Sequence, residues 1–168
     1  MKPTPLFIDA VRLREVLNYD PDTGVFTWRV STSNRAPVGS VAGWNTDGHI
    51  GIAIDGVKYK AHRLAWVYMT GEQPQFEIDH INGVRDVNRW TNLRDVPAIF
   101  NCQNQRRAQP KNKSCGLLGV CRDKRTGRWY SQICANNKVH HLGSFPTAEE
   151  AHQAYVEAKR KLHPGYTL

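Results

Sequence analysis

The chain has 168 residues, of which 40% are hydrophobic and 23% charged, with a formal net charge of +8. This composition is typical of a soluble globular protein and excludes a disordered chain. No apolar run approaches the roughly 18 to 20 residues that a membrane-spanning helix needs, so we expect no membrane partner. The N-terminus lacks the apolar stretch and cleavage site of a signal peptide, which predicts a cytoplasmic protein.

Positive charge is concentrated in the last third of the chain. Residues 111–168 contain 10 Lys and Arg against 4 Asp and Glu, a net charge of +6, whereas residues 1–110 contain 13 against 11. Such a segment favours a polyanionic partner, above all nucleic acid. Charge by itself leaves open the alternative that it serves solubility alone.

The four cysteines are Cys102, Cys115, Cys121 and Cys134. No Cys-x-x-Cys pair occurs, and cytosolic thiols stay reduced, so neither a zinc site nor a disulfide framework is expected. We expect small buried or half-buried apolar side chains at these positions.

The N-terminal third begins with a short helix and a strand. Asp9 is a suitable N-cap for an amphipathic helix over residues 9–17. A turn-rich segment follows, and residues 25–28 have the pattern of a strand. Residues 31–47 are polar and irregular, and no regular element is expected there.

A hairpin and a second helix come next. Residues 50–54 and 57–61 alternate in hydrophobicity on either side of Asp55-Gly56, one of the best hairpin signals in a sequence. Residues 61–69 then follow a helical period and are followed by a glycine suited to end the helix.

A strand–loop–strand–helix unit is predicted from residue 77 onward. Glu77–His80 and 92–95 would be its two short strands. Its helix would start near Pro97, a residue favoured at the first helical position, and run to about Arg107. The polar, basic stretch after it, interrupted by a proline, predicts an exposed linker.

The last part of the chain predicts three strands and a helix. The strand-like segments are 119–122, 129–134 and 139–143, and turn-forming residues connect them. Thr147 and Glu150 form a capping box at the start of a helix that reaches about Leu162. The fold class is therefore α+β, with a first domain at 1–107, a linker at 108–114 and a second domain at 115–168.

The segment after residue 78 carries the residue types of metal-assisted phosphodiester hydrolysis. The reaction needs a nucleophilic water and neutralisation of charge on the phosphate and the leaving oxygen, and one hard cation can supply the neutralisation. Magnesium is usually held by one or two oxygen ligands, which Asp79 and Asn101 could provide. His80 has a suitable side chain to take the proton of the water.

The ordered set Asp79-His80-Ile81-Asn82-Gly83, Asn88-Arg89, Asn92-Leu93-Arg94 and Asn101 resembles the HNH, or ββα-metal, nuclease motif, in particular that of phage and intron-encoded homing endonucleases. The resemblance implies a ββα-metal core at about 76–107. It also implies that Asp79 and Asn101 bind the metal, that His80 is the general base, and that Asn92 braces the loop. Asparagine at the final position shifts the expected cofactor from zinc or nickel to Mg²⁺ or Mn²⁺.

Several basic residues around this motif are candidates for phosphate contacts. They are Arg63, Arg85, Arg89 and Arg94. His62 precedes the first of them, in a tract that also occurs ahead of the Asp-His pair in these phage proteins. It is either a structural hydrogen-bonding residue or a phosphate contact or secondary catalytic group.

The tract LGSFPTAEEAHQAY, with Gly119-Val120 and Gly127-Arg128-Trp129, resembles the AP2 DNA-binding domain, which is also found attached to phage HNH endonucleases. In that fold a three-stranded sheet enters the major groove and a helix covers the opposite face. The resemblance and strand parity together give candidate DNA contacts at Arg122, Lys124, Arg125, Arg128, Tyr130, Gln132, Lys138 and His141. Cys121, Asp123 and His141 depart from the plant pattern, so plant target specificity is not expected. A basic stabilising or protein-interaction module is the alternative.

The sequence thus predicts a site-preferring, metal-dependent endonuclease acting on double-stranded DNA, a homing endonuclease of a bacterial or phage-infected cell. It would nick or cut both strands, as a monomer or a homodimer on DNA. Two alternatives stay open. One is a DNA-binding regulator with an inactive HNH fold, and the other is a non-homing HNH nuclease of phage defence or packaging.

Overall fold

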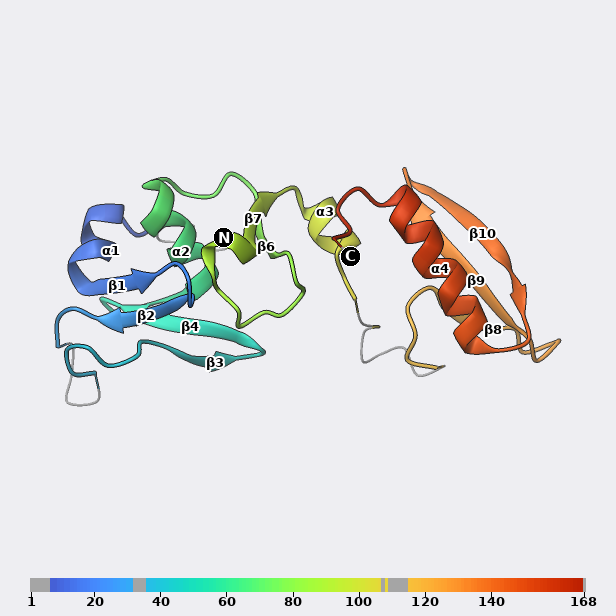
Figure 1. Ribbon diagram of the computed structural model, residues 1–168, viewed down its shortest axis with the longest axis horizontal. Helices are drawn as coiled ribbons and strands as arrows, with labels where there is room; N and C mark the ends of the chain where they lie inside the picture. Colours follow the sequence, from blue (N-terminus) through green and yellow to red (C-terminus); the bar gives the residue numbers. More distant parts are fainter. Residues whose placement is uncertain (1–6, 32–35, 107, 109–114, 168) are drawn as a thin grey trace. The chain divides into compact units, whose positions relative to one another are not determined.

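The computed structural model describes residues 7–31, 36–106, 108 and 115–167. The chain forms two compact units, Met1–Pro97 and Ala98–Leu168 (Figure 1). The sequence predicts that the first domain ends at residue 107. In the structure the first unit ends at Pro97, and the residues that follow it are grouped with the second unit.

The first unit begins with helix α1 (Ala10–Val16) and the antiparallel hairpin of β1 (Leu17–Asp20) and β2 (Val25–Trp28). The Asp9 side chain caps α1 by accepting a hydrogen bond from the backbone N of Arg12 at 3.3 Å, as its position predicts. The helix stops one residue short of the predicted end, because the next residue is already extended and starts β1.

A three-stranded sheet follows, in the order β3 (Trp44–Thr46), β4 (His49–Ile54) and β5 (Val57–Lys60). The predicted hairpin is present, with Asp55 and Gly56 both at positive φ (50° and 81°), as a tight two-residue turn requires. Strand β3 lies inside the segment predicted to be irregular. All three of its residues are exposed, so no alternation marks it in the sequence.

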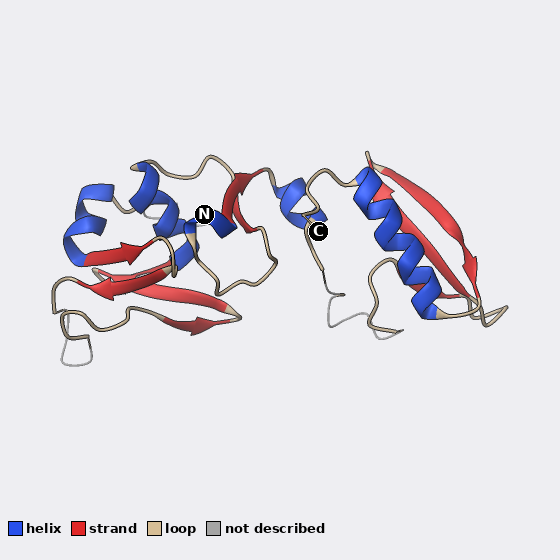
Figure 2. Cartoon of the chain, in the orientation of Figure 1, coloured by secondary structure: helices blue, strands red, loops and turns tan. Residues whose placement is uncertain are grey.

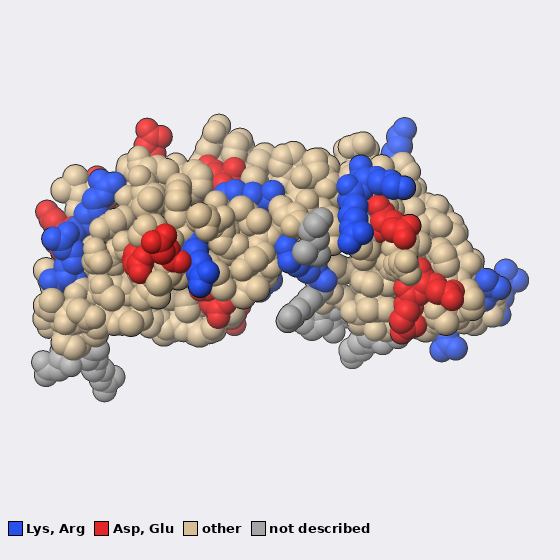
Figure 3. All heavy atoms as spheres, viewed as in Figure 1, with Lys and Arg blue, Asp and Glu red and all other residues tan. Residues whose placement is uncertain are grey.

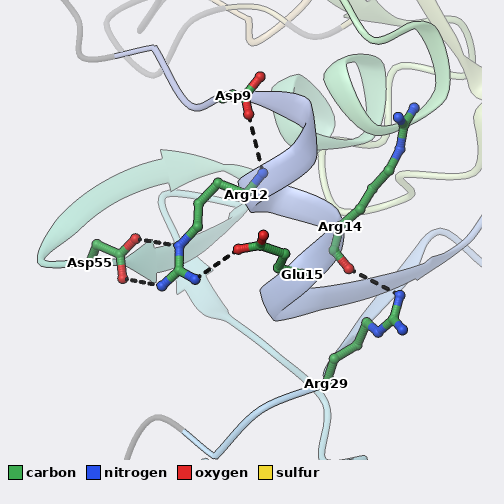
Figure 4. A network of polar contacts seen from close by, with 6 residues as sticks. All are labelled: Asp9, Arg12, Arg14, Glu15, Arg29 and Asp55. Carbon is green, nitrogen blue, oxygen red and sulfur yellow. Dashed lines mark hydrogen bonds and ion pairs between the residues drawn. The ribbon is translucent and has the colours of Figure 1, made fainter.

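A network of polar contacts fastens α1 to the sheet (Figure 4). The guanidinium of Arg12 donates two hydrogen bonds to the carboxylate of Asp55, both at 3.0 Å, and a third to Glu15 at 3.1 Å. Arg29 donates to the carbonyl oxygen of Arg14 at 3.0 Å. These bonds join the helix to the β4–β5 turn and to the residue after β2.

Helix α2 (Ala61–Thr70) ends at Gly71, which has φ 80° as predicted for a left-handed cap. Strand β6 (Glu77–His80), the 3₁₀ helix η1 (Trp90–Asn92) and strand β7 (Leu93–Val96) complete the first unit. One core joins these elements, and its fully buried side chains include Leu13, Leu17, Ile52 and Leu64. The core underlies α2 and β6, the two elements that carry the candidate catalytic residues.

The second unit contains the short helix α3 (Ala98–Gln103), an antiparallel sheet in the order β10–β9–β8, and helix α4 (Ala148–Leu162) (Figure 2). The strands are β8 (Val120–Arg122), β9 (Trp129–Ala135) and β10 (Lys138–Phe145). Helix α4 packs on one face of this sheet. The fold is the predicted small α+β unit.

The core of the second unit is small and lies between α4 and the sheet. Val120, Ala148 and Ala151 are buried there, with Trp129 and Phe145 packed against them. Thr147 caps α4 through a bond from Glu150 N at 3.2 Å, as predicted. Figure 3 shows acidic side chains near the N-terminal end of α4 and basic ones near its C-terminal end, a distribution that complements the helix dipole.

Two expectations are corrected by the structure. Helix α3 ends at Gln103, well before the predicted end near Arg107, which lies outside the described residues. The backbone N of Asn104 donates to the Phe100 and Asn101 carbonyl oxygens at this end of the helix, and the predicted linker falls largely outside the described residues. Cys102 and Cys134 are exposed rather than buried. No described helix is long and apolar enough to cross a membrane.

Candidate functional site

The antiparallel pair β6–β7 positions the central residues of the candidate site. Its register sets Asp79 opposite Arg94 and His80 opposite Leu93. Ile78, Asp79 and His80 are all buried, at 6%, 5% and 5% exposure. A strand with three consecutive buried residues is covered on both faces, so the acid and the imidazole are both held in the interior of the first unit.

Asp79 is paired with Arg94 across the two strands. The Nε and Nη2 atoms of Arg94 donate to Oδ2 of Asp79 at 2.9 and 2.7 Å. From the sequence, Arg94 is a candidate phosphate contact and Asp79 a candidate metal ligand. In the structure the guanidinium lies on the carboxylate, and this contact neutralises a charge that would otherwise be costly to bury.

Asn92 connects both ends of the loop between the strands. Its Oδ1 accepts from the backbone N of Asn82 at 2.9 Å, and its Nδ2 donates to the carbonyl oxygen of Val87 at 2.6 Å. The backbone of Asn92 also accepts from Ile81 N at 2.8 Å. These are the loop contacts that the resemblance implies for Asn92, and they fix the segment immediately after His80.

Asn88 determines which nitrogen of His80 holds the proton. Its Nδ2 donates to the carbonyl oxygen of Asp86 at 3.3 Å, which turns its Oδ1 toward His80 Nε2 at 3.1 Å. Because Oδ1 can only accept, Nε2 of His80 is the protonated nitrogen and Nδ1 has the lone pair. Burial lowers the pKa of His80, while the bond to Asn88 raises it, so a neutral imidazole is present at neutral pH.

Three histidines from separate elements meet beside this strand. The ring centroids of His62 on α2 and His80 on β6 are 5.1 Å apart, and His49 on β4 lies 5.2 and 6.0 Å from them. Their metal-ligating nitrogens all lie within 4.8 Å of one another, so the group could hold a metal ion. His49 was missed by the sequence analysis, because a lone histidine at the start of a strand has no motif around it.

His62 is one of the most enclosed polar residues of the first unit. It is only 6% exposed, and its Nδ1 is buried with no hydrogen-bond partner in the part of the chain that the structure describes. Two roles for His62 were considered from the sequence. A structural hydrogen bond through Nδ1, which would support the first role, is not found among the described residues. Burial lowers the pKa of His62 to about 3, with positive neighbours as smaller causes.

Asn101, the second predicted metal ligand, lies half-buried on α3 in the second unit. The end of the chain holds this helix in place. Gly165 N donates to Gln103 Oε1 and Thr167 Oγ1 donates to Asn104 Oδ1, both at 2.9 Å. Asp79 belongs to the first unit, so the Asp79–Asn101 ligand pair stays a prediction.

The other candidate phosphate contacts in the first unit differ in accessibility. Arg85 and Arg89 are exposed in the loop after His80, and Arg63 is half-buried on α2 next to His62. Arg85 and Arg89 are therefore accessible to a polyanion, while Arg63 is partly covered.

Strand parity in the second unit separates a covered face from an open one. Ser131 and Ile133 are buried beneath α4, whereas Gln132 is exposed and paired across the sheet with His141. The rings of Tyr130 and His141 are stacked, with centroids 6.0 Å apart. Tyr130, Gln132 and His141 thus share the face opposite α4, as strand parity predicts.

The predicted basic contacts lie mainly at the ends of this sheet. Lys124 and Arg125 are exposed in the turn after β8, and Lys138 is exposed at the start of β10. Arg128 is exposed and donates to the Ser144 carbonyl oxygen at 3.3 Å. Arg122 stacks over Trp129, 5.6 Å from the ring centre, on the face that α4 covers.

Comparison with known proteins agrees with this organisation. Residues 59–99 match the family described as HNH endonuclease, and residues 115–163 match the AP2 domain. The chain therefore has a segment similar to HNH endonucleases followed by one similar to AP2 domains, in the predicted order. The first match contains α2, the β6–β7 pair and its loop, and with them His62, Asp79 and His80.

Curated relatives each match less than half of the chain. Dehydration-responsive element-binding protein 2E of Oryza sativa subsp. japonica is 46% identical over 56 residues, covering 32% of this chain and 17% of that protein. Dehydration-responsive element-binding protein 2A of Arabidopsis thaliana is 35% identical over 77 residues, covering 44% and 23%. The chain spans about a fifth of the length of these relatives. No solved structure matches it significantly.

Proposed function

We propose that the protein is a metal-dependent endonuclease that hydrolyses phosphodiester bonds of double-stranded DNA. The observation that carries this proposal is His80, a buried imidazole beside Asp79 whose Nε2 is held by Asn88. It lies within the segment that matches the HNH endonuclease family. A neutral imidazole fixed at one nitrogen is suited to accept a proton at the other.

His80 is the general base of the proposed reaction. Its Nδ1 takes a proton from the attacking water, and the bond from Nε2 to Asn88 keeps the ring oriented while positive charge develops on it. Asn88 and Asn92 are positioning residues, since one holds the ring and the other holds the loop behind it.

Asp79 and Asn101 are the proposed ligands of the divalent cation. A carboxylate and an amide oxygen fit a hard cation such as Mg²⁺ or Mn²⁺. When bound, the ion neutralises charge on the phosphate and the leaving oxygen. Arg94 donates to Oδ2 of Asp79, so this guanidinium would share the carboxylate with the cation or move toward the phosphate.

The second unit is proposed to supply affinity for DNA and to set the register of the protein along it. Its open face presents Tyr130, Gln132 and His141, and exposed cations lie at its strand ends. We further propose preferred target sites and a homing role, since the HNH–AP2 order is that of the phage and intron-encoded endonucleases that the motif resembles. The same proposal includes two alternatives for the oligomeric state. A monomer would nick one strand, and a homodimer would cut both strands.

A supercoiled-plasmid assay tests the proposal. Wild type and His80→Ala are incubated with a plasmid that carries the DNA flanking the protein's gene, in Mg²⁺, Mn²⁺ or EDTA. DNA binding is followed in parallel by gel shift. We expect metal-dependent conversion to open-circle or linear DNA that His80→Ala loses while still binding. Intact plasmid with normal binding would favour the inactive regulator instead.

A further inference from the structure

The histidine cluster of the first unit has features that the proposed nuclease chemistry does not use. A general base needs one imidazole, and here three converge from β4, α2 and β6 with ligating nitrogens within 4.8 Å of one another. Because like charges this close repel one another, the arrangement favours neutral imidazoles, the form that binds metal ions.

Two of the three rings have a hydrogen bond to a neighbouring residue of the protein. Nε2 of His80 donates to Asn88 Oδ1, and His49 has a hydrogen bond with the backbone of Asp47. Histidines that ligate metals usually donate their other N–H to an oxygen in this way. The third ring, His62, has a buried Nδ1 with no hydrogen-bond partner among the described residues, which a hydrogen-bonded structural histidine would not have.

We propose that His49, His62 and His80 bind one divalent transition-metal ion of the zinc class, at a site separate from the carboxylate and amide ligands proposed above. Three neutral imidazoles are the donor set that favours Zn²⁺, Ni²⁺ or Co²⁺ over Mg²⁺. Three protein ligands also leave a fourth position open to water or phosphate. Ligand type thus separates the two ions, nitrogen for the transition metal and oxygen for magnesium.

The distances fit such a site after a small movement. Zinc–nitrogen bonds of about 2.0–2.1 Å in a tetrahedron place the nitrogens about 3.4 Å apart. A pair separated by up to 4.8 Å must therefore close by somewhat more than an ångström. His49 is the half-buried member of the group and has the room to rotate, whereas His62 and His80 are buried and fixed.

Charges around the cluster limit its affinity. Lys60, Arg63 and Arg85 act on these rings as positive neighbours, and Asp79 and Asp86 act on His80 as negative ones. Because the three ligands are neutral and basic side chains lie nearby, metal binding will be weaker than at a site with a carboxylate ligand. The titration must therefore extend to high micromolar metal.

Occupancy would have a regulatory consequence, which rests on the proposed function. The lone pair of His80 that would accept the proton of water is the same one that would bind the ion. A bound zinc-class ion therefore withdraws the general base, and Zn²⁺ should inhibit cleavage supported by Mg²⁺. Removing His49 should relieve that inhibition because the ion loses a ligand.

Cobalt provides a readout that does not depend on catalysis. The full chain is titrated with Co²⁺ and followed by visible absorption, for wild type, His49→Ala and His62→Gln. The controls are His140→Ala, which removes an exposed histidine of the second unit, and Asp79→Asn. We expect one Co²⁺ per chain in wild type and both controls, and at least 100-fold weaker binding in the two cluster variants.

Circular dichroism of each variant shows whether it is folded, and the half-buried His49 makes His49→Ala the safer of the two. A folded His49→Ala that binds Co²⁺ as wild type does would overturn the site, and so would loss of binding in Asp79→Asn. The second assay compares Mg²⁺-dependent cleavage with and without Zn²⁺. Cleavage that Zn²⁺ sustains or leaves unchanged would refute the inhibition, whereas Co²⁺ binding without any cleavage would refute the nuclease and leave the metal site intact.

Discussion

The two units handle their polar side chains in opposite ways. The first buries Asp79, His62 and His80 over a broad core, and the side chains of Arg94 and Asn88 hold Asp79 and His80 in place. The second has a small core, and its sheet presents Gln132 and His141 to solvent. Chemistry requires groups held rigidly away from water, while recognition of a long polyanion requires accessible groups. The contrast suggests that cleavage and affinity can be removed independently.

The largest expected effect is the loss of cleavage on Asp79→Ala. A metal ion supplies several kcal/mol of charge stabilisation, so loss of its charged ligand should slow cleavage by about 10³-fold. Affinity for DNA, measured by fluorescence anisotropy, should change less than about threefold because the second unit is untouched. A matching fall in affinity would break the division of roles between the units.

The next effect concerns the packing behind His80. Gly24 has φ +77°, and a Cβ there would lie 2.3 Å from the backbone carbon of Asn88. Gly24→Ala should cost about 3 kcal/mol, from the left-handed conformation and from overpacking. Gly56 has φ +81° with open space around it, so Gly56→Ala should cost only about 1 kcal/mol.

Urea unfolding of the two alanine variants measures the difference directly. Gly24→Ala should also slow cleavage, since it displaces the residue that orients the general base. Equal losses of stability in both variants would mean that the Gly24 contact does not constrain the loop.

Removing charge from the second unit should weaken binding and leave chemistry intact. Lys124 and Arg125 are exposed in one turn, and if both contact phosphate, replacing them with alanine should lower affinity roughly tenfold at moderate salt and reduce the salt slope by about 2. Lys161→Ala, at the exposed end of α4, is the matched control and should change neither. Cleavage at saturating protein should keep its wild-type rate, and a lower plateau would contradict the division.

Local signals account for the parts of this protein that the sequence predicts well. The hairpin at Asp55-Gly56, the cap at Thr147 and the pair Asp79-His80 each depend on residues close together in the chain. Strand parity likewise places Gln132 on the open face. Such features follow from backbone geometry and need no knowledge of long-range packing.

Features made by distant residues were not predictable. His49, His62 and His80 come from three elements, and nothing in the spacing of the three positions indicates that they meet. The pairing of Arg94 with Asp79 depends on the β6–β7 register, which the sequence predicts only approximately because the second strand begins one residue later than expected. The short exposed strand β3 has no alternation to reveal it.

The smallest expected effect is on the pH dependence of stability, and it shows whether the second unit buries a charged side chain. Lys159 is 3% exposed, donates to the Gln105 carbonyl oxygen, and lies 4.6 Å from the Tyr166 ring centre. Burial lowers the pKa of Lys159 to about 8. Between about pH 8 and the ordinary lysine value near 10.4 the unfolded chain binds more protons, so Lys159 makes stability rise with pH.

Comparison with Lys159→Met isolates this contribution, since every other titrating group is common to both proteins. From pH 8 to pH 10, the free energy of unfolding of wild type should rise by about 1 kcal/mol more than that of the variant. This difference is smaller than burial alone would give, because the hydrogen bond and the aromatic ring offset part of the cost of burying the charge. Chemical denaturation at each pH measures the gain. Parallel curves would mean that Lys159 stays charged when folded, and the second unit would then bury a full charge as the first unit does.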